Sequence, residues 1–220
     1  MTDSELALAR QRMVAEQLAA RGIRDTRVLA AMARLPREQF IGAAQRERAY
    51  EDSPLPIGSG QTISQPWIVA RMLELASLMP NDRVLEVGAG SGYQAALLSG
   101  LVREVFAIER IAALADTAKD RLRIYPNVQL GIFDGTYGWA EHAPYDAILV
   151  AAGAPAVPTL LADQLAEGGR LVIPVGPRGQ QRLGRILRAG DHFTTTWDTG
   201  CTFVDLVGRF GWGGEGPGLA

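Results

Sequence analysis

The residues best suited to bind a ligand form the run Val84–Tyr93, in which a short apolar segment precedes glycine at three alternate positions. Gly88, Gly90 and Gly92 allow the backbone to turn sharply and to approach a ligand without obstruction by a Cβ atom. The helix-like sequence that follows would point its N-terminal N–H groups at the same ligand. The run therefore predicts a nucleotide-type cofactor turn.

Two acidic residues accompany this turn. Glu109 ends the next strand-like segment, and a carboxylate at that place can accept hydrogen bonds from both hydroxyl groups of a ribose. Glu86 lies within the strand that precedes the glycines, where a carboxylate suits an ammonium group. Together they predict a ligand that carries an adenosine at one end and a positive charge at the other.

The choice among adenosine cofactors depends on the position of Tyr93. A dinucleotide turn needs glycine there, because the helix must pack closely on the strand beneath a pyrophosphate. No Gly-x-x-x-x-Gly-Lys-Ser/Thr phosphate loop occurs in the chain. S-adenosyl-L-methionine has a ribose, an ammonium and no phosphate, so the pattern favours a methyl-donor site and disfavours a nicotinamide oxidoreductase. A hydrolase interpretation lacks the Gly-x-Ser-x-Gly nucleophile elbow.

Composition excludes several other classes of protein. The 220 residues have a formal net charge of −2, which gives no electrostatic footprint for nucleic acid. No apolar run approaches the length of about 20 residues that a membrane span needs. The single cysteine, Cys201, excludes an intrachain disulfide, and two histidines are too few for an ordinary zinc site without several carboxylates. We expect a cytoplasmic protein with no metal, membrane or nucleic-acid partner.

From about residue 82 onward, short apolar strands alternate with amphipathic helices, a rhythm typical of parallel βαβ units with both sheet faces covered. The strands are expected at 83–87, 104–109, 127–132, 145–151 and 169–175. The helices are expected at 92–100, 111–123 and 158–166. Three further segments, 182–188, 193–197 and 202–207, indicate a terminal antiparallel group. The fold class is therefore α/β, with a central, mostly parallel sheet of Rossmann-like type.

The N-terminal third adds helices to this core. Helices are expected at 4–21, from Asp25 or Thr26 to Pro36, and at 66–78. Residues 40–65 show no sustained period and form a long connection, which is more often functional than idle in a compact domain. We expect one domain over 1–210, with the helices and a covering segment in 1–80 and the cofactor-binding core in 81–210. Residues 211–220 are expected to form a flexible glycine-rich tail.

Ligands of open α/β sheets bind beyond the carboxyl ends of the strands. This rule brings Gly88–Gly92, Glu109, Asp134 and Ala151–Pro155 to one edge. Asp134 could accept a hydrogen bond from the exocyclic amine of adenine. The alternative is a simple Asp-Gly turn with Gly135.

The segment Leu55–Pro66, with its run Gly-Gln-Thr-Ile-Ser-Gln-Pro, resembles the protein-L-isoaspartate O-methyltransferases. The resemblance covers roughly residues 10–208 and includes the glycine turn and the run Gly-Gly-Arg-Leu-Val-Ile-Pro at 168–174. It implies transfer of a methyl group from S-adenosyl-L-methionine to the free carboxylate of L-isoaspartyl, and by extension D-aspartyl, residues in damaged proteins. The products would be S-adenosyl-L-homocysteine and a methyl ester that cyclises to a succinimide. The implied fold is a seven-stranded methyltransferase sheet with added N-terminal helices and an altered order of the last strands.

Family roles carry over to the matching positions. By resemblance Ser64 is the active-site serine, and the Gln61–Ile63 segment lies over the cofactor. The implied cofactor-binding residues are Gln61, Thr62, Ile63, Glu86, Gly88, Ala89, Gly90, Ser91, Glu109, Arg110, Asp134 and Gly135. Within this set, Glu86 and the turn would line the methionine side, Glu109 the ribose, and Asp134 with Gly135 the adenine.

The chemistry implied needs no general base, because a carboxylate with a pKa of about 4 is already ionised at neutral pH. Catalysis would come from alignment and from fixed donors around the acceptor carboxylate. Ser64 would be such a donor and would position the substrate. Its alternative role is to cap the helix that begins at Pro66.

The chain departs from the family pattern near its end. The family commonly shows Val-Arg-Phe-Val-Pro-Leu where this chain has Cys201–Leu206, so Thr202 replaces an arginine and Asp205 a proline. The segment helps to hold the substrate peptide in the family, and the change removes one cation and adds one anion. Three alternatives therefore stay open: a methyltransferase for other peptide aspartates, one for a small molecule, and a non-catalytic S-adenosylmethionine-binding protein.

Overall fold

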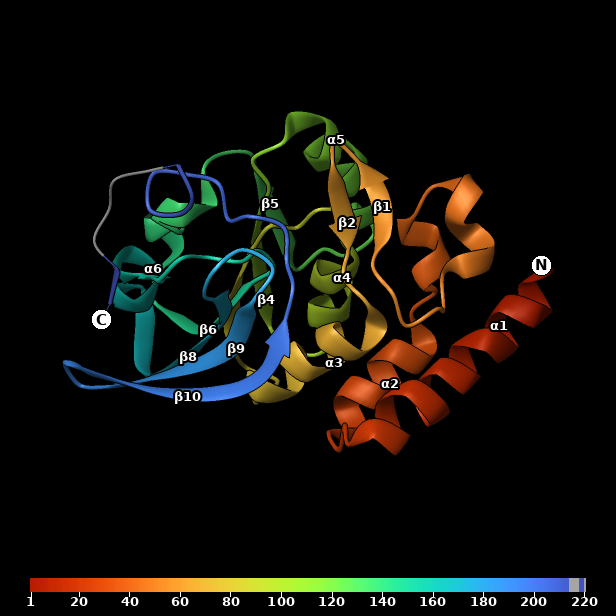
Figure 1. Ribbon diagram of the computed structural model, residues 1–220, viewed down its shortest axis with the longest axis horizontal. Coiled ribbons are helices and arrows are strands. Elements are labelled where there is room, and N and C mark those ends of the chain that lie inside the picture. The colour runs from red at the N-terminus through yellow and green to blue at the C-terminus, as the bar shows by residue number, and fades with distance from the viewer. Residues whose placement is uncertain (214–217, 220) are drawn as a thin grey trace.

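A seven-stranded sheet forms the centre of the molecule (Figure 1), seen in a computed structural model that describes residues 1–213 and 218–219. The strand order is β10-β9-β8-β6-β3-β4-β5. The strands are β3 (Arg83–Val87), β4 (Glu104–Ile108), β5 (Val128–Gly131), β6 (Tyr145–Val150), β8 (Leu165–Val175), β9 (Gln181–Ala189) and β10 (His192–Cys201). Strands β5, β4, β3, β6 and β8 run parallel, and β9 and β10 continue the sheet as antiparallel neighbours.

Each face of the sheet is covered. Along β3, Val84 belongs to the hydrophobic cluster that includes helices α3 (Pro66–Leu75) and α4 (Tyr93–Ser99), whereas Leu85 belongs to a second cluster that includes α6 (Thr159–Asp163). Successive residues of a strand point to opposite faces, so one apolar run serves two cores. Helix α5 (Ala112–Leu122) contributes Ala118 and Leu122 to the first cluster. The predicted α/β class with a mostly parallel, Rossmann-like sheet is confirmed.

The N-terminal helices lie at one end of the molecule, beside α3 (Figure 1). The expected single helix over 4–21 is divided into α1 (Asp3–Arg12), a π-helical segment (Met13–Leu18) and a 3-10 turn (Ala19–Arg21). Helix α2 (Thr26–Arg34) begins at the predicted cap, because the Asp25 carboxylate accepts hydrogen bonds from two backbone N–H groups of its first turn. Leu6 and Met32 join the same hydrophobic cluster as Val84, so these helices share a core with the sheet.

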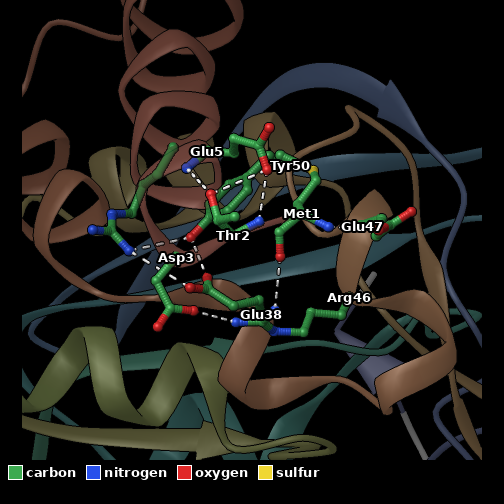
Figure 2. Close-up of polar contacts among 9 residues, drawn as sticks. Met1, Thr2, Asp3, Glu5, Glu38, Arg46, Glu47 and Tyr50 are labelled. Atoms are coloured by element: carbon green, nitrogen blue, oxygen red, sulfur yellow. Dashed lines mark hydrogen bonds and ion pairs between the residues drawn. The ribbon is translucent and has the colours of Figure 1, made fainter.

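A polar network holds the start of α1 against the segment that follows α2 (Figure 2). Thr2 and Glu5 form a reciprocal capping box at the first turn. The amino group of Met1 lies 2.6 Å from Oε1 of Glu47. Exposed ion pairs contribute little to stability. We therefore infer only that the network attaches the start of α1 to the segment that follows α2.

The predicted structureless connection over 40–65 contains short elements. It begins at the end of a 3-10 turn (Arg37–Phe40) and holds a second one (Ala43–Arg48) and a hairpin of β1 (Leu55–Gly58) and β2 (Gln61–Ile63). The strands are too short to show a period in the sequence, and the hairpin buries only Leu55 and Ile63, which pair across it. This hairpin turns the Gln61–Ile63 run back over the edge of the sheet.

The terminal antiparallel group is confirmed for its first two segments only. The β9–β10 hairpin turns at Gly190, but residues 202–207 are not a strand of the sheet. Instead, the N–H of Gly153 donates to the carbonyl oxygen of Val204 at 2.8 Å, and the N–H of Leu206 donates to the carbonyl oxygen of Gly153 at 2.8 Å. These bonds carry residues 202–212, called here the C-terminal strap, across the carboxyl ends of the strands.

The last elements are small. Strand β11 (Gly218–Leu219) pairs with β7 (Val157–Pro158) in a separate two-stranded ladder. The expected glycine-rich tail over 211–220 lies partly outside the described residues. No helix within the described ranges has the length and apolarity needed to cross a membrane.

Candidate active site

Three neighbouring parallel strands end side by side, and the chain leaves them at Gly88, Glu109 and Ala151. Strand β3 has β4 on one side and β6 on the other, so the chain order reverses at β3 and a crevice opens there. The N–H of Ala151 donates to the carbonyl oxygen of Val87 at 2.8 Å, and that of Gly88 to the carbonyl oxygen of Ile108 at 2.9 Å. The expected gathering of these segments at one edge is confirmed.

The glycine turn has the conformation that its sequence predicts. Gly88, Gly90 and Gly92 have φ values of +89°, +52° and +85°, which L side chains rarely adopt. The N–H of Gly90 donates to Oε2 of Glu109 at 2.9 Å, and Oε1 of the same carboxylate accepts from the N–H of Ile111 at 2.8 Å. Glu109 is therefore fixed to the turn, and each of its oxygens retains a further lone pair for a ligand.

Three hollows meet at this edge. The strand-end cavity, of about 620 Å³, runs past Gly88, Glu109 and Gly135. The glutamate cavity, of about 360 Å³, reaches Glu86. The serine groove, of about 760 Å³, runs past Ser64. Thr62 and Ala151 line all three hollows, so the hollows adjoin one another at these two residues.

Glu86 is a buried carboxylate without a partner. It is 1% exposed, and neither oxygen has a hydrogen-bond partner among the described residues. Burial, followed by the negative charge of Glu109, holds the pKa of the Glu86 carboxyl well above its ordinary value, and the nearby Gln94 amide offsets only part of this rise. Gln94, from the first turn of α4, lines the same cavity, and its Nε2 also lacks a partner within the described chain. Such a pair of acceptor and donor is suited to a ligand that carries both an ammonium and a carboxylate.

Ser64 lines both the glutamate cavity and the serine groove. Its alternative role as a helix cap is not observed, because Gln65 occupies the cap position of α3 and no side-chain cap bond is present. Oδ1 of Asp52 accepts from the N–H of Trp67 at 3.2 Å and takes that role instead. The Ser64 hydroxyl makes no hydrogen bond within the described part of the chain, which leaves it available to a ligand.

Arg37 bonds the backbone of Ser64 and was missed as a site residue. Its side chain is fully buried, and no described carboxylate pairs with it. Nε donates to the carbonyl oxygen of Ala49 and Nη2 to that of Ser64, each at 2.8 Å. The guanidinium also lies over the ring of Tyr93, 5.1 Å from its centroid. Arg37 thus links the backbone of Ser64 to the first residue of the helix after the glycine turn.

Tyr93 shows why the turn differs from a dinucleotide turn. Its ring is 1% exposed and meets Phe40 edge to face, with centroids 5.5 Å apart. The side chain therefore fills space beneath Arg37, where a dinucleotide turn would need close helix–strand contact.

Most of the remaining predicted residues line the hollows. They are Gln61, Thr62, Gly88, Gly90, Arg110 and Gly135 in the strand-end cavity, and Ile63, Ala89 and Ser91 in the glutamate cavity. Gly135 admits no side chain, because a Cβ there would lie 2.6 Å from Val87 Cγ1. The structure brings all of these predicted positions to one site.

Asp134 differs from the rest because it lines none of these hollows. Oδ1 accepts from the N–H of Thr136 at 2.9 Å and from its hydroxyl at 2.7 Å, and Oδ2 accepts from the N–H of Arg209 at 2.8 Å. The carboxylate thus stabilises the Asp-Gly turn and also holds the C-terminal strap. A contact with adenine stays a prediction.

The two departures near the chain end lie in different places. Asp205 lines the strand-end cavity, and Oδ2 accepts from Nε of Arg178 at 2.8 Å. Arg178 also lies over the ring of Trp212, 4.3 Å from the centroid. Thr202 lines the serine groove, and its hydroxyl donates to the carbonyl oxygen of Gly179 at 3.1 Å. The added anion is therefore paired and lies outside the serine groove.

The chain is similar to known proteins over most of its length. The model of the family described as Protein-L-isoaspartate(D-aspartate) O-methyltransferase (PCMT) matches residues 9–211. The chain belongs to the PCMT family. The Protein-L-isoaspartate O-methyltransferase of Geobacter metallireducens is 52% identical over 212 residues, which cover 94% of this chain and 98% of the relative. Protein-L-isoaspartate O-methyltransferase 2 of Pelobacter propionicus is 56% identical over 207 residues, or 92% of each chain.

Solved structures of PCMT proteins have the same fold. A protein-L-isoaspartate O-methyltransferase superposes with a TM-score of 0.84 at 29% identity, over 92% of this chain and 67% of that one. A putative protein-L-isoaspartate O-methyltransferase from Plasmodium falciparum, solved in complex with S-adenosyl-L-homocysteine, gives 0.78 at 26% identity, over 90% and 98%. Similarity to PCMT proteins thus extends over the N-terminal helices as well as the sheet.

Proposed function

We propose that this protein is an S-adenosylmethionine-dependent methyltransferase that acts on the free carboxylate of L-isoaspartyl residues, and by extension D-aspartyl residues, in damaged proteins. The observation that carries the proposal is the meeting of three hollows at Thr62 and Ala151. Two of them suit the methyl donor, and the third, the serine groove, opens beside Ser64. Membership of the PCMT family supplies the substrate class.

The residues present fit the cofactor. The unpartnered carboxylate of Glu86 would accept from its ammonium, and Gln94 would donate to its carboxylate. Glu109 would accept from the ribose hydroxyls, while Gly135 would leave space for the adenine. The other predicted binding residues that line the hollows would surround the same molecule: Gln61, Thr62, Ile63, Gly88, Ala89, Gly90, Ser91 and Arg110. The predicted contact between Asp134 and the adenine would need Asp134 to reach the cavity from outside its present lining.

When bound, S-adenosylmethionine supplies an activated methyl group that a carboxylate oxygen can attack in line. The residues of this chain have three tasks: to align the acceptor with that methyl group, to exclude water, and to stabilise the acceptor by fixed donors. A general base is not needed, because the acceptor carboxylate is ionised at neutral pH. The Ser64 hydroxyl would donate to that carboxylate, and the Arg37 bond to the Ser64 carbonyl would hold it in position.

Cys201 also lines the serine groove, but its environment opposes a nucleophilic role. Burial, followed by the nearby charge of Asp198, raises the pKa of the Cys201 thiol to about 11. The thiol is therefore protonated at neutral pH. This favours direct transfer to the substrate over a covalent step on the enzyme.

We further propose that residues 1–210 act as one domain, because the N-terminal helices and the sheet share a hydrophobic cluster. Isoaspartyl proteins or peptides would be the partners. A cytoplasmic location stays a prediction that rests on cysteine content.

A paired-peptide assay tests the proposal. The purified protein is given labelled S-adenosylmethionine with an isoaspartyl peptide or with its aspartyl isomer. We expect base-labile carboxyl methylation of the isoaspartyl peptide only. Equal labelling of both peptides would favour an enzyme for peptide aspartates in general. Cofactor binding without labelling of either peptide, or of small carboxylic acids, would favour a binding protein.

A further inference from the structure

Arg21 places a guanidinium at the junction of two grooves. It lines the serine groove and also a neighbouring side groove of about 500 Å³. Of the described residues that line the serine groove, Arg21 is the only one with a formal charge. Its side chain is 45% exposed, so the guanidinium is accessible to a ligand in either groove.

The guanidinium is held in place from one side. Its Nη1 donates to Oδ2 of Asp52, and its carbon atom lies 5.0 Å from the ring centroid of Trp67. Asp52 also caps the helix that carries Trp67, so one carboxylate fixes both neighbours. Asp52 does not line the groove, and among the described residues no acceptor bonds to Nε or Nη2 of Arg21. Two donors are therefore free for a carboxylate, the anion whose geometry a guanidinium matches.

The serine groove shares different residues with its two neighbouring hollows. At one end, the serine groove shares Thr62, Ser64 and Ala151 with the glutamate cavity. At the other end, it shares Arg21, Trp67 and Thr199 with the side groove. A peptide with its acceptor carboxylate beside Ser64 would therefore bring a neighbouring residue, and not the acceptor, to Arg21.

The other arginine of the side groove is already paired. Nε and Nη2 of Arg71 donate to the two oxygens of Asp198 at 2.9 and 2.6 Å, and Nη1 donates to Glu74 at 2.7 Å. All three nitrogens of its guanidinium are thus bonded to carboxylates, whereas Asp52 bonds only Nη1 of Arg21 and leaves Nε and Nη2 without an acceptor among the described residues. The family pattern has an arginine at the position of Thr202, and this chain lacks that cation. Arg21, from the N-terminal helices, places a cation in the same groove.

We propose that Arg21 recognises a carboxylate on a residue that flanks the isoaspartyl residue, so that the enzyme prefers damaged sites with an acidic neighbour. This inference rests on the proposed function and names the substrates that the same site favours. The partner group is an aspartate or glutamate side chain of the substrate. Because Arg21 is half exposed, solvent screens the interaction and limits its strength.

A ratio of rates tests this role. Isoaspartyl peptides carry glutamate at each of the two positions before and after the damaged residue in turn, and matched peptides carry glutamine. For the wild type we expect kcat/KM to be about fivefold higher with glutamate at one or more positions, the scale of a screened charge pair. In Arg21→Gln the ratio should fall to about 1. Any general loss of activity affects both peptides and cancels in the ratio.

Arg24→Gln is the matched control, because Arg24 is an exposed neighbour that lines neither groove. It removes the same charge, and its ratio should equal that of the wild type. Arg21→Glu should invert the preference toward lysine-flanked peptides. A wild-type ratio near 1 at every position, or a preference that persists in Arg21→Gln, would overturn the role of Arg21. Failure of the wild type to methylate even the glutamine peptides would overturn the proposed function itself.

Discussion

The cofactor side and the substrate side of the site meet at Thr62 and Ala151, and they are built from different parts of the fold. On the cofactor side, Glu86 and Glu109 are 1% and 5% exposed and lie within or directly after central strands. On the substrate side, Ser64, Arg21 and Thr202 are half-buried or exposed. Ser64 and Thr202 belong to connections between elements, and Arg21 ends a 3-10 turn. The first side is held by the parallel sheet itself. The second depends on the packing of helices and loops against one another, so it can vary without disturbing the sheet.

The two departures from the family pattern lie one on each side of the site. Thr202 lies in the exposed groove, where one cation is lost and Arg21 offers another. Asp205 lies over the strand-end cavity, where a new charge needs a partner, and it has one in Arg178. Changes on the cofactor side should therefore alter cofactor binding, and changes on the substrate side should alter turnover or peptide KM.

The largest effect is expected for Glu86→Gln, which removes the buried carboxylate. Loss of a charge-assisted bond to the cofactor ammonium should weaken binding of S-adenosyl-L-homocysteine by roughly 10- to 100-fold. Calorimetry measures this constant. Glu104→Gln, at the opposite end of the neighbouring strand, is the control and should bind normally. Unchanged affinity in Glu86→Gln would remove Glu86 from the cofactor site.

The same variant makes a prediction about pH. Burial holds the pKa of Glu86 above its ordinary value, so the folded protein keeps a proton that the unfolded chain releases. The contribution to stability is present below the ordinary carboxyl pKa and is lost as the pH rises. At pH 8 without ligand, Glu86→Gln should therefore melt roughly 2–4 °C above the wild type, a difference that shrinks toward pH 4. A thermal scan across pH measures it, and a lower melting temperature at pH 8 would contradict the assignment.

Ser64→Ala should act on turnover. Removing one fixed donor to the acceptor carboxylate should lower kcat by about 10- to 100-fold, while affinity for S-adenosyl-L-homocysteine changes less than about twofold. Steady-state kinetics and calorimetry separate the two effects. Ser59→Ala, at the exposed tip of the β1–β2 hairpin, serves as the control. A large loss of cofactor affinity would contradict the positioning role.

Arg37→Lys should have a related but smaller effect. Lysine keeps the charge but cannot bond two carbonyl groups in the fixed geometry of a guanidinium, so Ser64 loses one support. We expect kcat to fall about tenfold with little change in KM for S-adenosylmethionine, when assayed well below the measured melting temperature. Arg27→Lys, which also replaces an arginine bonded to backbone carbonyls, is the control. A rise in KM at unchanged kcat would assign Arg37 to binding instead.

Thr202→Arg should have the smallest effect. Placing the family's cation in the serine groove should lower the KM for an isoaspartyl peptide by about threefold, because an exposed charge pair contributes at most about 1 kcal/mol. Peptide kinetics at saturating cofactor measure it, and kcat should stay constant. An unchanged KM would contradict the idea that the lost cation weakened substrate capture.

Much of the cofactor side could be predicted because it follows from local patterns and one topological rule. The glycine turn, the strand before it and Glu109 are read from adjacent residues, and parallel strands place their carboxyl ends together. On the substrate side, Ser64 was predicted, and that prediction came from the family resemblance. The β1–β2 hairpin escaped prediction because each strand has three or four residues. Residues 202–207 were wrongly expected to form a strand. Their apolar residues are compatible with pairing beside β10 and equally with crossing the strand ends to Gly153, so the sequence could not distinguish the two.

The amino-acid sequence by itself determined the α/β rhythm, the left-handed glycine turn and the carboxylates at the strand ends, since each depends on the residues next to it. Only the tertiary structure decided that Glu86 has no hydrogen-bond partner among the described residues, that Arg178 pairs with Asp205, that Arg37 bonds the carbonyl oxygen of Ser64, and that Arg21 lines the same groove as Ser64. These facts depend on contacts between segments far apart in the chain. Burial and charge pairing are properties of such contacts, so they arise only when the sheet, the hairpin and the N-terminal helices pack together.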